Sequence, residues 1–182
     1  MTTSGGQRLF HIVINTHSIW LHGDPKGFRS RGHRIYSSGD YRNPEPRGEH
    51  ARLHIYQLEH SAPPTFLPSG AFAVVGRAIV ENLSSRGHTV QAASVNSTRS
   101  HQLVSLPNDF DQIKVIIGWC KRFATRVARQ RFDALRDVEI WAEGETIKPI
   151  RDESHRINAR DYILIKQGAD AWTWSPEQGE SW

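Results

Sequence analysis

The sequence predicts an α+β fold in which helices cover an antiparallel sheet. Short segments with an apolar residue at every second position are typical of half-buried strands, and two longer segments carry apolar residues at helical spacing. These segments follow the order strand, helix, strand, strand, helix, strand, and a chain of 182 residues suffices for one sizeable core. We therefore expect a single domain over residues 1–182.

The first strand is predicted near the N-terminus, where Phe10, Ile12 and Ile14 occupy every second position. Residues 21–68 differ from the rest of the chain because they are rich in Gly, Pro, Ser, Arg and His and show no sustained period. A long stretch of this kind is typical of an inserted loop, either functional or merely solvated. We place such an insertion directly after the first strand.

Two helices follow the insertion. The first is predicted over residues 69–86, with Gly87 at the position of a C-terminal cap, and the second over residues 110–131, where Asn108 or Asp109 can cap the start. Cys120 falls on the apolar face of the second helix, which predicts an inert thiol. Between the two helices, strands are predicted at residues 89–95 and 101–106.

The C-terminal part predicts a strand over 138–147, a last helix over 152–167 and a polar tail at 175–182. Strand, helix, strand, strand, helix, strand is the ferredoxin-like order. The predicted fold is thus a ferredoxin-like antiparallel sheet with the helices at 69–86 and 110–131 on one face. An extra C-terminal helix and the long insertion after the first strand are added to it.

The charge balance favours a polyanionic partner. The sequence has 23 Lys and Arg against 19 Asp and Glu, with an isoelectric point near 9.5. A basic protein without such a partner explains the same balance. A single cysteine excludes an intramolecular disulfide, and no apolar run approaches the roughly 20 residues that a membrane span needs. We expect a cytoplasmic protein without a membrane segment.

Arginines are concentrated in two places. A phosphate backbone is bound mainly by such side chains, and interleaved tyrosines can stack on bases. A solvated face is the alternative for both groups. The candidate DNA-binding residues are Arg29, Arg31 and Arg34 in the insertion, and Arg122, Arg126 and Arg129 on one face of the second helix.

Three segments resemble single-tyrosine HUH transposases of the insertion-sequence and REP-associated type. THSIWLHGDPKGF at 16–28 resembles the exit of their first strand, SVNSTRSHQLVSLPND at 94–109 their metal-binding strand, and DYILIKQGADAW at 161–172 their tyrosine helix. The resemblance implies that the protein binds single-stranded or hairpin DNA and takes part in DNA transposition and recombination. It also implies a homodimer, because the family combines the metal strand of one subunit with the tyrosine helix of the other.

The resemblance implies a catalytic site with a tyrosine and a metal ion. Tyr162 matches the nucleophile, which attacks a DNA phosphate and becomes linked to the 5′ end. Mg²⁺ or Mn²⁺ neutralises the phosphate in the family. His101 matches the second histidine of the metal pair. Gln167 is the candidate for the third ligand if the helix ends before Gly168, and Asn158, one turn before Tyr162, is the alternative.

Two motif positions depart from the family pattern. Arg99 stands where the family has the first histidine, and Lys166 where it has the glutamine. Arginine offers no lone pair to a metal. One interpretation is a lapsed enzyme that still binds DNA. Another is that Arg99 and Lys166 stabilise the phosphate directly and no cofactor is needed, and a third is a register error of one or two residues.

An unrelated RNA-binding module with the same fold is a further alternative. Such modules stack bases on aromatic residues of their strands. The predicted strand at 101–106 has none.

Overall fold

The computed structural model describes residues 6–19, 21, 46 and 48–181. The chain divides into two compact units, one of residues 1–16 with 65–182 and one of residues 17–64. The first unit contains the whole sheet and its covering helices. In the second unit, residues 51–60 form a helix where the sequence predicted a loop, so that prediction is wrong there. This helix, α1 (Ala51–His60), buries no residue.

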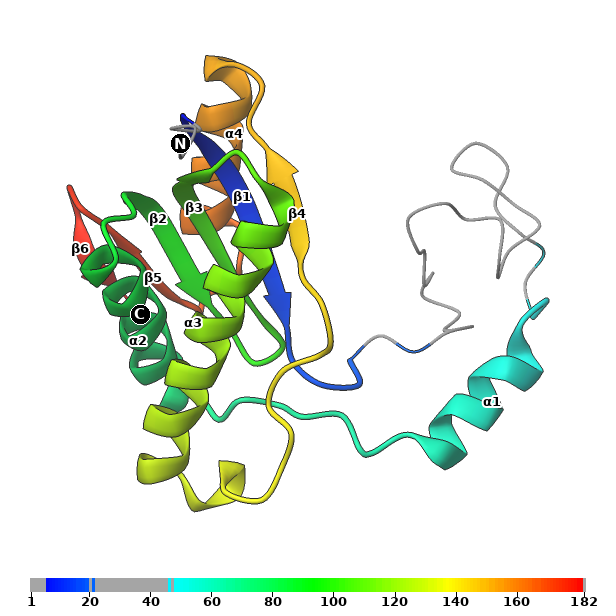
Figure 1. Cartoon of the computed structure of the whole chain (residues 1–182). Coiled ribbons are helices and arrows are strands. Elements are labelled where there is room, and N and C mark those ends of the chain that lie inside the picture. The colour runs from blue at the N-terminus through cyan, green and yellow to red at the C-terminus, as the bar shows by residue number, and fades with distance from the viewer. Residues whose placement is uncertain (1–5, 20, 22–45, 47, 182) are drawn as a thin grey trace. The chain divides into compact units, whose positions relative to one another are not determined.

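The sheet has six strands, and every neighbouring pair is antiparallel (Figure 1). Its spatial order is β4-β1-β3-β2-β5-β6. The α+β class and the antiparallel sheet predicted from the sequence are therefore confirmed. The strands are β1 (Gln7–Asn15), β2 (Val90–Val95), β3 (Arg99–Pro107), β4 (Thr146–Pro149), β5 (Trp172–Ser175) and β6 (Gly179–Ser181).

Two helices, α2 (Ala71–Ser85) and α3 (Phe110–Arg131), pack against each other over one face of the sheet (Figure 1). The main core lies between them and the alternate residues of the central strands. Asp109 caps α3 by accepting hydrogen bonds from the backbone N–H groups of Asp111 and Gln112. Burial raises the pKa of the Cys120 thiol to about 12, in agreement with an inert side chain.

The last long helix, α4 (Glu153–Ile165), covers the opposite face of the sheet (Figure 1). It begins after Asp152, whose carboxylate accepts a hydrogen bond from the N–H of His155. Its buried residues Ala159 and Ile163 belong to a second, smaller core with Leu103 of β3. The sheet therefore separates two apolar layers, and the side chains on its second face point toward α4.

The C-terminal part differs from the prediction in two elements. The strand predicted over 138–147 is displaced: β4 begins only at Thr146, because Gly144 has a φ of +73° and turns the chain just before it. The second difference is that β5 and β6 form a hairpin that the sequence did not predict, with Gly179 at a φ of +70°. The buried Trp172 anchors this hairpin to the core.

Candidate active site around Tyr162

Two histidines that lie far apart in the sequence meet on the α4 face of the sheet. In the antiparallel ladder, His11 of β1 lies opposite Leu103 of β3, and Val13 lies opposite His101. Because side chains alternate along a strand, His11 and His101 project from the same face as Leu103, which contacts α4. The strand pairing thus makes them diagonal neighbours.

The two imidazoles form a buried hydrogen-bonded pair. Nε2 of His11 lies 3.1 Å from Nδ1 of His101, and the two residues are 7% and 2% exposed. Burial, with the charges of Lys148 and His155, lowers the pKa of His11 to about 4. Burial also lowers the pKa of His101 to about 3, with further contributions from His11, Arg99 and Lys148. Both rings are therefore neutral near pH 7, and one donates its N–H to the other.

Tyr162 of α4 lies against this pair. Its ring centroid is 6.1 Å from that of His11 and 5.5 Å from that of His101, with interplanar angles of 62° and 83°. Edge-to-face contacts of this kind favour one ring orientation. The tyrosine remains 42% exposed. The ring is thus held by buried partners while the residue stays open to a large ligand.

Two cations flank the histidine pair. Arg99 precedes His101 by two residues on the same strand, and Lys148 of β4 lies directly opposite His11. Strand alternation puts both side chains on the α4 face, with Arg99 half-buried and Lys148 exposed. Within the described part of the chain, neither side chain forms a hydrogen bond or an ion pair. The face beside Tyr162 is therefore positively charged.

The end of α4 brings Gln167 to the same place. The helix ends at Ile165, and the Nε2 atom of Gln167 donates a hydrogen bond to the backbone carbonyl of Tyr162 at 2.9 Å. Gln167 lies near enough to His101 to raise the pKa of that imidazole, against the larger effect of burial. Lys166 is exposed and reaches Tyr162 only through its backbone N–H. The structure thus places Gln167 at the end of α4, bonded to the backbone of Tyr162 and near His101.

The donors around His101 do not fit a hard divalent cation. Nε2 of His101 and Oγ of Ser94 are buried without a hydrogen-bond partner, and the two residues face each other across β2 and β3. Mg²⁺ and Mn²⁺ are usually bound through carboxylates and other oxygen ligands. Among the described residues, Arg99 and Lys148 help to lower the pKa of His101 and Lys148 that of His11, and no acidic group takes part. Among the described residues, no three His, Cys, Asp or Glu side chains are grouped to hold a metal ion.

The predicted DNA-binding arginines fall in two places. Arg29, Arg31 and Arg34 lie outside the described residues. Arg122, Arg126 and Arg129 line an open groove of about 1270 Å³ between α3 and the segment 136–143. The guanidinium of Arg126 lies 5.4 Å from the ring centroid of Phe123, and Arg129 donates to the carbonyl of Val138 at 2.8 Å. This groove lies on the α3 side of the sheet, on the other face from Tyr162.

His11 and Lys148 are site residues that the sequence prediction missed. The alternation in β1 places His11 on the face opposite Phe10, and this was the available signal. It does not reveal that His101, 90 residues later, lies beside it. Lys148 was missed because the fourth strand was predicted to end at residue 147.

No protein-family model matches the sequence, and no curated protein sequence matches it. Among solved structures, the chain is similar to a REP-associated tyrosine transposase bound to a REP hairpin. The TM-score is 0.45, with 17% sequence identity over 89% of this chain and 66% of that chain. The chain thus spans slightly less than two thirds of the length of that protein. Within its described residues, no helix is long and apolar enough to cross a membrane.

Proposed function

We propose that the protein binds single-stranded or hairpin DNA and cleaves and rejoins a strand through Tyr162, as a transposase-like enzyme. The observation that carries this proposal is the position of Tyr162, held against a buried histidine pair and flanked by Arg99 and Lys148. A phenol fixed beside positive charge is suited to attack a phosphodiester, because the reaction gathers negative charge on the phosphate.

The proposed reaction exchanges one phosphoester bond for another. The phenolic oxygen of Tyr162 attacks phosphorus, the bond from phosphorus to the 3′ oxygen breaks, and the 5′ phosphate becomes joined to the tyrosine. The phenol proton passes to water, and the leaving 3′ oxygen takes up a proton from water. Because a phosphodiester is both consumed and formed, attack by a 3′ hydroxyl can reverse the step and join strands.

The groove beside α3 supports a second contact with DNA. Its arginines, Arg122, Arg126 and Arg129, suit the phosphates of a hairpin stem. The sheet order β4-β1-β3-β2, with α2 and α3 on one face, supports a ferredoxin-like core for the proposed enzyme. The arginines at 29, 31 and 34 and a homodimeric assembly remain parts of the same proposal.

A second candidate function is DNA binding without cleavage. One observation favours it: the donors around His101 do not form a site for the divalent cation that the sequence resemblance implies. In that case Tyr162 would contact DNA without attacking it.

A labelled hairpin with single-stranded flanks separates the two candidates. The cleaving enzyme should give a covalent protein–DNA band on a denaturing gel when the label is at the 3′ end, and a shortened free strand when it is at the 5′ end. Tyr162→Phe should abolish both products and retain binding, while the control Tyr56→Phe, on α1, should behave like the wild type. Binding without either product would favour the second candidate.

A further inference from the structure

We infer that Arg99 and Lys148 hold a DNA backbone phosphate in front of Tyr162, in place of a divalent cation. The inference rests on the proposed function, since it names the groups that bind the phosphate at the same site. It concerns a pair that the sequence prediction did not contain, because Lys166 was the expected partner of Arg99.

The strand register places the two cations on either side of the tyrosine contact. Lys148 lies opposite His11, and Arg99 lies two residues before His101 on β3. Residues opposite each other in an antiparallel pair have Cβ atoms about 5 Å apart, and residues two positions along a strand are about 7 Å apart. By this register Arg99 and Lys148 lie two strands and four residues apart, with roughly 16 Å between their Cβ atoms, so extended side chains from both positions can meet at a ligand that lies between them beside Tyr162.

The charges around the histidine pair favour an anion over a metal ion. Arg99 and Lys148 both project from the α4 face of the sheet, on either side of the buried pair of His11 and His101. A divalent cation would be repelled by both groups, whereas a phosphate would be attracted by both. Neither cation is neutralised by another described residue, so each retains its donors for a ligand.

The two side chains are chemically suited to different parts of this task. The planar guanidinium of Arg99 can bind two phosphate oxygens at once, and the ammonium of Lys148 acts as a compact point charge. Lys166, by contrast, is exposed at the C-terminal end of α4, not on the sheet, and its hydrogen bond to Tyr162 is made by its backbone N–H. The structure thus favours Lys148 over Lys166 as the second cation.

The test measures binding of a fluorescein-labelled hairpin with single-stranded flanks by anisotropy over a series of KCl concentrations. We expect the dissociation constant of the wild type to be the same within about twofold in EDTA and in MgCl₂ after correction for ionic strength. Each of Arg99→Gln and Lys148→Gln should reduce the log–log salt slope by about 0.7–0.9, the value for one phosphate contact. Arg99→Lys should keep the wild-type slope, because it keeps the charge.

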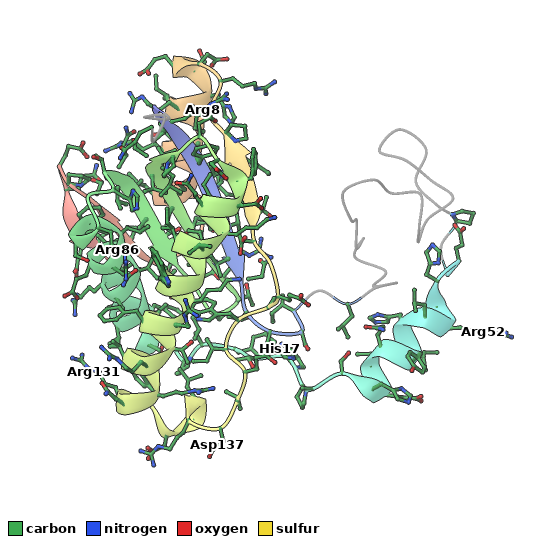
Figure 2. All side chains as sticks on the ribbon, in the orientation of Figure 1. Arg8, His17, Arg52, Arg86, Arg131 and Asp137 are labelled. Carbon is green, nitrogen blue, oxygen red and sulfur yellow. The ribbon has the colours of Figure 1, made fainter. Side chains whose placement is uncertain are left out.

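Arg131→Gln is the matched control. Arg131 is exposed at the C-terminal end of α3 (Figure 2) and lies outside the groove, so its removal should leave the slope unchanged. Thermal denaturation checks that each variant is folded. If Arg99→Gln fails to fold, Lys148→Gln carries the test.

Two results would overturn the inference. One is a wild-type salt slope in both Arg99→Gln and Lys148→Gln. The other is tight binding of Mn²⁺ to the free protein, measured by electron paramagnetic resonance, that is lost in His101→Ala. A tyrosine adduct that forms only with Mg²⁺ would refute the inference and leave the proposed function standing. Reduced slopes without any adduct would support the phosphate contact and refute the proposed cleavage.

Discussion

Nε2 of His11 lies 3.1 Å from Nδ1 of His101, and this hydrogen bond joins two central strands directly beneath the ring of Tyr162. The pair is buried and neutral, so its contribution is structural and positional rather than that of a charged group. Its removal should therefore affect the stability of the sheet as well as the position of the tyrosine.

Replacing His11 by Ala should destabilise the protein. The change leaves Nδ1 of His101 buried without a partner, which costs about 1–3 kcal/mol in the free energy of unfolding. His11→Gln retains polar atoms that can bond to His101 and should lose less. His60→Ala on exposed α1 is the control and should change stability by no more than about 0.5 kcal/mol. Urea denaturation gives all three values, and equal stabilities for wild type and His11→Ala would refute the role of the pair.

Stability should decrease as the pH falls below 6.5. The pKa values of His11 and His101 are lowered from 6.5 to about 4 and about 3, so both stay neutral in the folded protein while the unfolded chain takes up protons. The stabilisation is complete above pH 6.5 and is lost toward pH 4 with a slope of at most about 1.4 kcal/mol per pH unit for each histidine. Urea denaturation at several pH values measures it. His11→Leu should show a shallower slope, and an unchanged slope would contradict the lowered pKa of His11.

Gly76→Ala should destabilise the contact between α2 and the C-terminal hairpin. A Cβ atom at Gly76 would lie 2.1 Å from Cζ3 of Trp172, so the buried indole would have to move. Overpacking of this kind costs about 1–3 kcal/mol. Gly118→Ala is the matched control in α3, where a Cβ meets nothing within 4 Å, and it should stabilise by about 0.5–1 kcal/mol. Thermal unfolding should order the proteins as Gly118→Ala, wild type, Gly76→Ala, and the reverse order would refute the packing.

Asn96 should position the end of the tyrosine helix. Its Oδ1 accepts hydrogen bonds from the backbone N–H groups of Thr98 and Arg99, and its Nδ2 donates to the carbonyl of Gln167 at 3.4 Å. Asn96→Asp keeps the acceptor and loses the donor. We expect it to slow formation of the Tyr162 adduct severalfold while the DNA dissociation constant stays within about twofold. Equal rates for the two proteins would show that the link to Gln167 does not position the tyrosine.

Local patterns predicted the long helices well. The bounds of α3 agree with the prediction at both ends. Its apolar face of six turns and the capping carboxylate of Asp109 are both features of the local sequence. β4 and the β5–β6 hairpin were missed or displaced. Each has only three or four residues, too few to show a period, and their pairing depends on partners elsewhere in the sheet.

The site was predictable only where a motif covered it. Tyr162, His101 and Arg99 were found from the resemblance, and the pattern of β3 placed the last two on one face. His11 and Lys148 are brought to the site by the pairing of β1 with β3 and β4, and no local sequence pattern specifies that pairing. The lowered pKa values likewise follow from burial under α4 and not from neighbours in the sequence.

The most direct test of the account is to locate the covalent bond to DNA. The native protein is incubated with the hairpin substrate, digested with nuclease and trypsin, and analysed by mass spectrometry. The account predicts that the peptide of residues 161–166, which contains Tyr162, gains the mass of a 5′-linked nucleotide. A modification on another residue, or an unmodified peptide with Mg²⁺, with Mn²⁺ and with EDTA alike, would contradict the central claim that Tyr162 cleaves DNA.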